Sequence, residues 1–248
     1  MRWRRYAAGA LLAGIVLFWL ITLPPTMPTH AMVVKGFTPS ESWLYDRNGE
    51  LIDSIRVDFH TRRLAWVPLD KVAPSVAATI ISAEDKRFRD HGGVDWLAVG
   101  SAVRARFDGS RSRGASTLSM QVAAFLAPDL APPGSRSWRD KLRQMRAAMA
   151  LESIWSKDEI LEAYLNLAGF RGETEGIGAA ALGLFGKTPE ALTPEDAVLI
   201  TALLPAPTAS VDKVSARACR IAPKMDCARL RAAAMEMAGT PRTLALDP

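Results

Sequence analysis

Residues 83–93 read AEDKRFRDHGG, a segment that gathers charged side chains around one phenylalanine and ends in two glycines. It follows the apolar run 76–82, whose three-to-four spacing predicts a helix that ends near Glu84. A solvated helix end explains the charges but not Phe88 or the diglycine. Phe88 is most simply a core residue, and His91 before two glycines is typical of a turn. The segment therefore joins a buried helix to a sharp turn that carries ionisable groups.

The sequence around this segment is mostly helical in pattern. Besides 76–82, apolar residues recur at helical spacing in 96–106, 116–126, 136–155, 157–167, 175–185 and 195–204. Two start signals support these predictions, because Glu159 follows Ser156 by three residues and Pro194 follows Thr193 directly. Asn48-Gly49 between two alternating apolar runs predicts a β-hairpin. The expected fold is mostly α with a small N-terminal β element.

Size and charge limit the class of protein. The chain has 248 residues, of which 49% are hydrophobic, so it can build one sizeable core and at most two domains. The net charge of +5 suits an anionic surface or substrate. No basic stripe interleaved with aromatic residues is present, which makes nucleic acid an improbable partner.

The N-terminus predicts a membrane segment. Residues 6–23 carry no charge and follow the sequence MRWRR, whose arginines should stay cytoplasmic. A cleaved signal peptide ending at the Thr-His-Ala before Met32 is the alternative, but the apolar run exceeds the usual signal-peptide core of about 7 to 15 residues. The expected organisation is a cytoplasmic tail at 1–5, one transmembrane helix at 6–23, a proline-rich linker at 24–40, the main domain at 41–207 and a C-terminal appendage at 208–248.

The two cysteines point to a disulfide rather than to a metal. Cys219 and Cys227 form an even pair in a polar tail, and an oxidising compartment permits them to bond. The histidines are scattered and no Cys-x-x-Cys is present, so a structural zinc is not expected.

Candidate chemistry centres on one carboxylate and one helix start. Glu84, at the end of an apolar helix, can act as a base, although a charged helix end paired with its neighbours is the simpler explanation of this stretch alone. Ser116 and Thr117 can cap a helix whose N–H groups bind a phosphate oxygen, or they can be an ordinary cap. On the helix 136–155, Lys141 and Gln144 share one face, opposite a face of three arginines (Arg139, Arg143 and Arg146) that is either solvated or directed at anionic lipid headgroups.

Four sequence blocks, in order, resemble the peptidoglycan glycosyltransferases of family 51. The first is Glu-Asp-x-x-Phe-x-x-His-x-Gly, met by Glu84, Asp85, Phe88, His91 and Gly93. The others are RGASTLSMQ at 113–121, ILEAYLN at 160–166 and EGIGAAALGLFGK at 175–187. GAST and KLRQ look most like the penicillin-binding protein 1C branch.

The resemblance implies a fold, a reaction and a set of site residues. The fold would be that of a lysozyme-like glycosyltransferase domain. The reaction would polymerise lipid II, with Glu84 deprotonating the sugar 4-hydroxyl that attacks a growing chain held as an undecaprenyl diphosphate, to give a β-1,4 bond. Lys141 would steady the leaving diphosphate. The substrate-binding residues would be Asp85, Arg87, His91, Ser116, Thr117, Gln121, Lys141 and Gln144.

The same resemblance implies surroundings. The catalytic domain would lie on the periplasmic side of the inner membrane, with lipid II, the growing glycan chain and the membrane as partners, together with a transpeptidase or other cell-wall synthesis proteins. The resemblance implies no particular cofactor and is compatible with a divalent cation, Mg²⁺ or Mn²⁺.

The sequence departs from the family at three places. The usual glutamate of the third block is Gln144 and its arginine is Asp140, and an amide cannot take a proton as a carboxylate can. Leu184 stands where an aromatic residue is usual. Ser210 and Lys213 match Ser-x-x-Lys by chance, without the other motifs of a penicillin-binding domain. Two alternatives therefore stay open: a non-catalytic lipid II or glycan-binding partner of another synthase, and a muramidase-like hydrolase.

Overall fold

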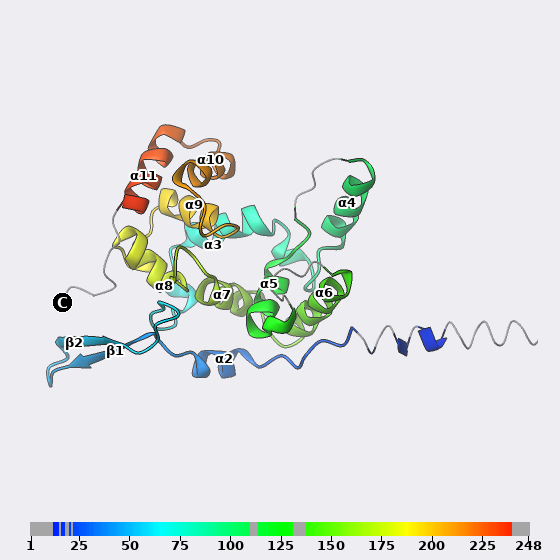
Figure 1. Ribbon diagram of the computed structural model, residues 1–248, viewed down its shortest axis with the longest axis horizontal. Coiled ribbons are helices and arrows are strands. Elements are labelled where there is room, and N and C mark those ends of the chain that lie inside the picture. Colours follow the sequence, from blue (N-terminus) through cyan, green and yellow to red (C-terminus); the bar gives the residue numbers. More distant parts are fainter. Residues whose placement is uncertain are drawn as a thin grey trace, which may run out of the picture. The chain divides into compact units, whose positions relative to one another are not determined.

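The computed structural model describes residues 12–14, 16, 17, 20, 22–109, 114–130 and 137–239 (Figure 1). The chain forms two compact units. The first unit consists of residues 1–28 and 90–155, and the second of residues 29–89 and 156–248. Part of the membrane segment predicted at 6–23 lies outside the described residues. Among those that are described, no helix has the length and apolar character needed to cross a bilayer.

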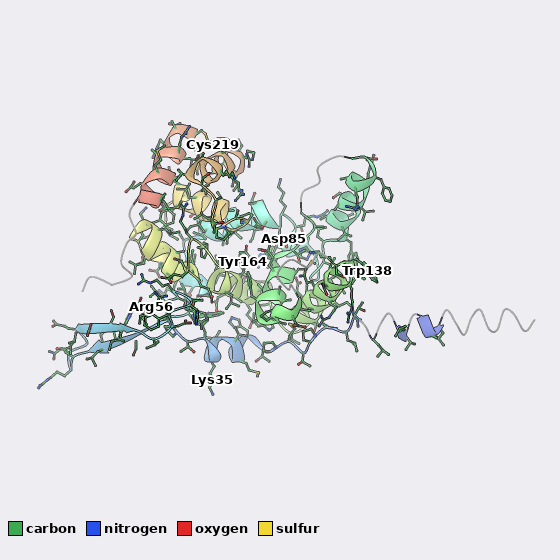
Figure 2. All side chains as sticks on the ribbon, in the orientation of Figure 1. Lys35, Arg56, Asp85, Trp138, Tyr164 and Cys219 are labelled. Carbon is green, nitrogen blue, oxygen red and sulfur yellow. A yellow bond between two sulfur atoms is a disulfide. The ribbon has the colours of Figure 1, made fainter. Side chains whose placement is uncertain are left out.

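The second unit contains the predicted hairpin. Strands β1 (Glu41–Tyr45) and β2 (Leu51–Arg56) pair antiparallel, with Trp43 opposite Ser54. The turn contains Asn48 and Gly49, and Gly49 has the positive φ of 86° that this turn needs. At the base of the hairpin, Arg56 (Figure 2) donates to both oxygens of Glu173 at 3.1 and 2.7 Å. The hairpin prediction is confirmed.

Helices make up the rest of the second unit. They are α2 (His30–Gly36), α3 (Pro74–Glu84), α7 (Lys157–Leu167), α8 (Ile177–Ala180), α9 (Pro194–Leu203), α10 (Val211–Ile221) and α11 (Cys227–Gly239), with short turns η1 (Leu69–Lys71), η4 (Ala181–Phe185) and η5 (Pro189–Ala191). The chain passes from this unit to the first through η2 (Phe88–Asp90). The predicted helix 175–185 is thus α8 followed by a π turn.

The core of the second unit lies around α9, which packs against α3, α10 and α11. Every residue of α9 from Asp196 to Leu203 is buried, as expected of a helix that is apolar on all sides. Its start is fixed by Pro194 and by a capping box of Thr193 and Asp196. A second capping box, of Ser156 and Glu159, starts α7. Both start signals in the sequence are confirmed.

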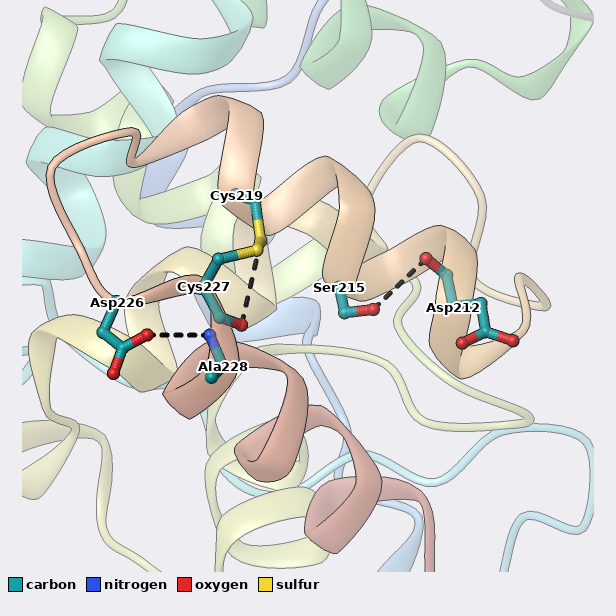
Figure 3. The surroundings of a disulfide bond; sticks show 6 residues. All are labelled: Asp212, Ser215, Cys219, Asp226, Cys227 and Ala228. Carbon is teal, nitrogen blue, oxygen red and sulfur yellow. Dashed lines mark hydrogen bonds between the residues drawn. A yellow bond between two sulfur atoms is a disulfide. The ribbon is translucent and has the colours of Figure 1, made fainter.

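The two C-terminal helices pack on α9 and are joined to each other by the predicted disulfide. Cys219 on α10 and Cys227 on α11 are bonded, and no cysteine is free (Figure 3). Val214 and Ala218 of α10 and Leu230 of α11 are fully buried. The segment predicted as an appendage therefore contributes side chains to a core.

In the first unit, the structure gives the bounds of three helices and one short turn. They are α4 (Trp96–Phe107), α5 (Leu118–Leu126), α6 (Trp138–Glu152) and η3 (Pro128–Leu130). A buried cluster of Val94, Met120, Met145 and Ala148 holds them together. Helix α5 packs against α6, and α6 also contacts η3.

Residues 22–28 are fastened to α6 and the turn after it. Arg146 Nη1 donates to the buried hydroxyl of Thr22 at 2.5 Å. The indole N–H of Trp155 donates to the carbonyl of Pro28 at 2.9 Å. The stretch 24–40 was predicted to be a proline-rich linker, and within it residues 30–36 form helix α2 in the second unit. His30 lies 3.1 Å from Glu162 there, so contacts distant in sequence support this helix.

Candidate active site

Glu84 is the last residue of α3 and is half-buried. The helix ends there because Asp85 leaves the helical conformation, with φ −151° and ψ 75°, while its N–H still bonds to Ile81. Asp85 is buried, and Tyr164 lies on α7 in the same unit (Figure 2). Burial, and secondly the charge of Glu84, raise the pKa of Tyr164. A buried phenol that stays protonated therefore lies within the field of the Glu84 carboxylate.

Two other residues of the stretch 83–93, Phe88 and Arg89, have structural contacts in the second unit. Phe88 is fully buried, as predicted, and the ammonium of Lys157 lies 4.6 Å from its ring centre. Arg89 pairs with Asp158 at 2.7 Å on the surface. Arg87 is half-buried. Packing and ion pairing thus account for Phe88 and Arg89, and the predicted site residues Glu84, Asp85 and Arg87 lie in the same unit.

His91 belongs to a buried polar group of the first unit. Its Nδ1 lies 3.8 Å from the carboxylate of Glu152, and both side chains are more than nine-tenths buried. The hydroxyl of Ser119 donates to the same carboxylate. The role of His91 as a residue that shapes the turn stays a prediction.

Gly93 explains the diglycine. It has a φ of +90°, and a Cβ there would lie 2.6 Å from backbone atoms of Ala148 on α6. Its carbonyl accepts a 2.6 Å hydrogen bond from Thr117 Oγ1. The turn can therefore contact both α5 and α6 only because residue 93 has no side chain.

Thr117 and Ser116 stand at the start of α5, as the sequence predicted. Thr117 is the N-cap, and its hydroxyl accepts from the N–H of Met120 at 3.2 Å. Ser116 is exposed just before it. Gln121 is half-buried one turn further along, with its N–H bonded to the carbonyl of Thr117 at 3.1 Å.

Lys141 brings a cation to this helix start. Its Nζ donates to Ser116 Oγ at 2.6 Å and lies 3.5 Å from Gln144 Oε1. Burial lowers the pKa of Lys141, because it disfavours the charged form. Among residues the structure describes, no carboxylate pairs with Lys141. An ammonium without a counter-ion beside a helix N-terminus is an arrangement suited to an anion.

Gln144 also contacts the turn that follows α5. Its Nε2 donates to the carbonyl of Leu130, a fully buried residue, at 2.7 Å. Arg143 pairs with Asp129 of the same turn at 2.7 Å. Helix α6 therefore holds both ends of α5, through Lys141 at its start and through Arg143 and Gln144 beyond its end.

The arginine face of α6 is partly used within the protein. Arg143 contacts Asp129 and Arg146 contacts Thr22, as described above, so neither side chain is simply solvated. Leu184, the other departure from the family pattern, is buried in η4 with 8% of its surface exposed.

Side chains of the ILEAYLN block hydrogen-bond α7 to residues 66–69 of the second unit. The carboxylate of Glu162 accepts from the Trp66 indole at 2.7 Å and from the Leu69 N–H at 2.8 Å. The side chain of Asn166 makes two hydrogen bonds to the backbone of Val67, each 2.8 Å long. Tyr164, from the same block, is the residue that sequence reasoning missed as a neighbour of Glu84.

The structure groups the predicted site residues in two sets. Ser116, Thr117, Lys141 and Gln144 come together in the first unit, where His91 and Gln121 also lie. Glu84, Asp85 and Arg87 belong to the second unit. Over the described ranges, no three His, Cys, Asp or Glu side chains are grouped in a way that could hold a metal ion.

Comparison with known proteins agrees with these blocks. The transglycosylase family model matches residues 48–226. A biosynthetic peptidoglycan transglycosylase of Rhodospirillum centenum is 43% identical over 144 residues, which are 57% of this chain and 60% of that protein. One from Mannheimia succiniciproducens is 37% identical over 174 residues, 69% of each chain. Penicillin-binding protein 1A of Escherichia coli is 35% identical over 203 residues, 79% of this chain but 23% of that protein.

The match to the family model includes every sequence block discussed above. The chain covers 60%, 69% and 56% of the first three relatives, so it spans somewhat less than two thirds of two of them. The family model alone accounts for well over half of the chain. The chain therefore belongs to the transglycosylase family.

Proposed function

We propose that this protein polymerises lipid II into β-1,4 glycan strands and releases undecaprenyl diphosphate. One observation carries the proposal beyond family membership: the half-buried ammonium of Lys141 lies 2.6 Å from Ser116 beside the start of α5. A diphosphate leaving group gains negative charge as its bond to the sugar breaks, and a fixed cation and helix start stabilise that charge.

The proposed chemical step needs one base. The 4-hydroxyl oxygen of one lipid II forms a bond to the anomeric carbon of the growing chain, whose bond to the diphosphate oxygen breaks. The hydroxyl proton goes to Glu84, and the bonding electrons leave with the diphosphate. The ammonium of Lys141 stabilises the negative charge that the diphosphate gains. Attack from the side opposite the leaving group inverts the anomeric centre. Tyr164 supports this role, because a protonated phenol near Glu84 adds no competing negative charge.

Asp85, Arg87, His91, Thr117, Gln121 and Gln144 are proposed to bind or shape the site rather than to exchange protons. For His91 and Thr117 the support is positional, since both are tied to the turn at Gly93 or to α6.

The polymerisation assay decides between this proposal and its alternatives. Detergent-solubilised protein would be incubated with labelled lipid II and the products sized on a gel, with Glu84→Gln as the inactive variant. Glu190→Gln is a matched control, because Glu190 is exposed and pairs only with Lys71 at 3.3 Å among described residues. A ladder of long glycans from the parent and the control supports the proposal. Bound but unpolymerised lipid II would indicate a binding partner, and cleavage of preformed glycan would indicate a hydrolase.

We also propose that the protein is a single-pass protein of the inner membrane with its catalytic domain in the periplasm. The uncharged stretch 6–23 behind an arginine-rich start supports this orientation. The Cys219–Cys227 disulfide is of a kind that persists in oxidising compartments. A transpeptidase or other cell-wall synthesis proteins are proposed as partners, because polymerisation leaves strands unlinked. A reporter active only in the periplasm, fused after residue 239, should be active; an inactive fusion would refute the orientation.

A further inference from the structure

Gln144 has a donor and an acceptor, and each faces its complement. Its Nε2 donates to the Leu130 carbonyl at 2.7 Å, and its Oε1 faces the Lys141 ammonium at 3.5 Å. Turning the amide over would place oxygen against oxygen and N–H against N–H. The two contacts therefore fix the orientation of the amide from both sides.

No ionised side chain could satisfy both neighbours. A glutamate has only acceptors, so one of its oxygens would face the Leu130 carbonyl without a hydrogen between them. Its other oxygen would approach Lys141 and neutralise it. With glutamine the ammonium keeps its place next to Ser116 and, within the described ranges, meets no carboxylate.

We infer that Gln144 is a positioning residue that holds Lys141 beside Ser116 without neutralising it, so that an incoming diphosphate meets an uncompensated positive charge. The inference rests on the proposed function of Lys141, and it gives the replacement of the family's glutamate a specific consequence. With glutamine instead of glutamate at position 144, the anion site keeps the full positive charge of Lys141 and has no second carboxylate. A carboxylate at this distance would compete with the diphosphate for the same ammonium.

Inorganic diphosphate is the probe that tests this inference. Calorimetric titration of the full-length protein in detergent, at fixed ionic strength and without divalent cations, gives the affinity. Gln144→Glu should weaken binding at pH 7 by about tenfold or more, since an opposite charge next to the ammonium is typically equivalent to at least one pKa unit. Lys141→Met should abolish binding.

Gln144→Met separates charge from packing. Methionine is close in volume and neutral, but it loses both hydrogen bonds. The Gln144→Met variant should therefore have a lower melting temperature than the parent. Its affinity for diphosphate should fall by less than that of Gln144→Glu. If the methionine variant loses as much affinity as the glutamate variant, the added negative charge has no effect of its own, and the inference that Gln144 matters by leaving Lys141 unneutralised is wrong. It is equally wrong if Gln144→Glu binds as tightly as the parent.

The pH dependence supplies a readout that a purely structural role would not change. Binding needs the ammonium, so it is lost as the pH rises through the pKa of Lys141. A carboxylate at position 144 should raise that pKa and shift the loss of binding to higher pH. An unshifted alkaline limb in Gln144→Glu would contradict the inference.

Polymerisation of lipid II by the same proteins separates the two proposals. A parent that binds diphosphate but makes no glycan refutes the proposed function and leaves the inference standing. A parent that makes glycan, with a Gln144→Glu variant of equal diphosphate affinity, refutes the inference alone. A parent that binds no diphosphate refutes the inference whatever the polymerisation result.

Discussion

Replacing Gly93 by alanine should destabilise the first unit by about 3 kcal/mol. Gly93 has a φ of +90°, where an L-residue is strained by roughly 1 to 2 kcal/mol. Its new Cβ would lie 2.6 Å from the carbonyl carbon and oxygen of Ala148 and 2.7 Å from the nitrogen of Met149. These are backbone atoms of a helix and cannot rotate away, so overpacking adds roughly 1 to 3 kcal/mol.

Gly92 is the matched control for this prediction. It adjoins Gly93 in the same turn, has no positive φ, and a Cβ there would meet nothing within 4 Å. For a chain of this size, about 3 kcal/mol corresponds to a fall in melting temperature of roughly 6 to 12 °C. Circular dichroism melts should show this fall for Gly93→Ala and little change for Gly92→Ala. Equal melting temperatures for the two variants would refute the argument from close approach.

Glu84→Gln should abolish lipid II polymerisation without unfolding the protein, because the amide keeps the shape but accepts no proton; a variant that polymerises like the parent would exclude Glu84 as the base. Lys141→Ala should lower turnover more than stability, and a collapsed melting temperature with unchanged specific activity would show a structural role. As the pH rises from 7, diphosphate binding by the parent should be lost before pH 10.5 is reached, since burial lowers the pKa of Lys141 from that value and only the ammonium attracts the anion; titrations from pH 7 upward test this. Replacing Cys219 and Cys227 by serine should cost about 2 to 3 kcal/mol in urea unfolding and leave polymerisation intact. An unchanged urea midpoint would show that the bridge does not stabilise the fold.

Local signals in the sequence were sufficient for most helices. The capping residues Ser156 and Thr193 act through neighbours three residues away, so their effect is visible without the fold. Helix α2 was missed because prolines surround it and its support comes from Glu162, far along the chain. Helix α11 was missed because alanines such as Ala234 fill its buried face and give a weak apolar signal. Helix α10 was missed although Val214, Ala218 and Ile221 recur at helical spacing.

The candidate site was predictable in its members but not in its contacts. The periodicity of α6 correctly placed Lys141 and Gln144 on one face. It could not show that the amide would reach Leu130, because that contact depends on the path of the chain after α5. Nor could it connect Tyr164 with Glu84, which lie on separate helices. The sequence showed two glycines at 92 and 93, and only the packing against α6 shows which one is required.

The bonds from Arg146 to Thr22 and from Trp155 to Pro28 change the mechanical meaning of the N-terminal segment. A free linker of the length predicted at 24–40 could extend roughly 55 Å and would let the domain move relative to the chain before it. Because residues 22–28 are attached at two points, a pulling force on the chain before Leu23 would be transmitted to α6. The helix that carries Lys141 is therefore also the helix to which a force on the N-terminal segment would be transmitted.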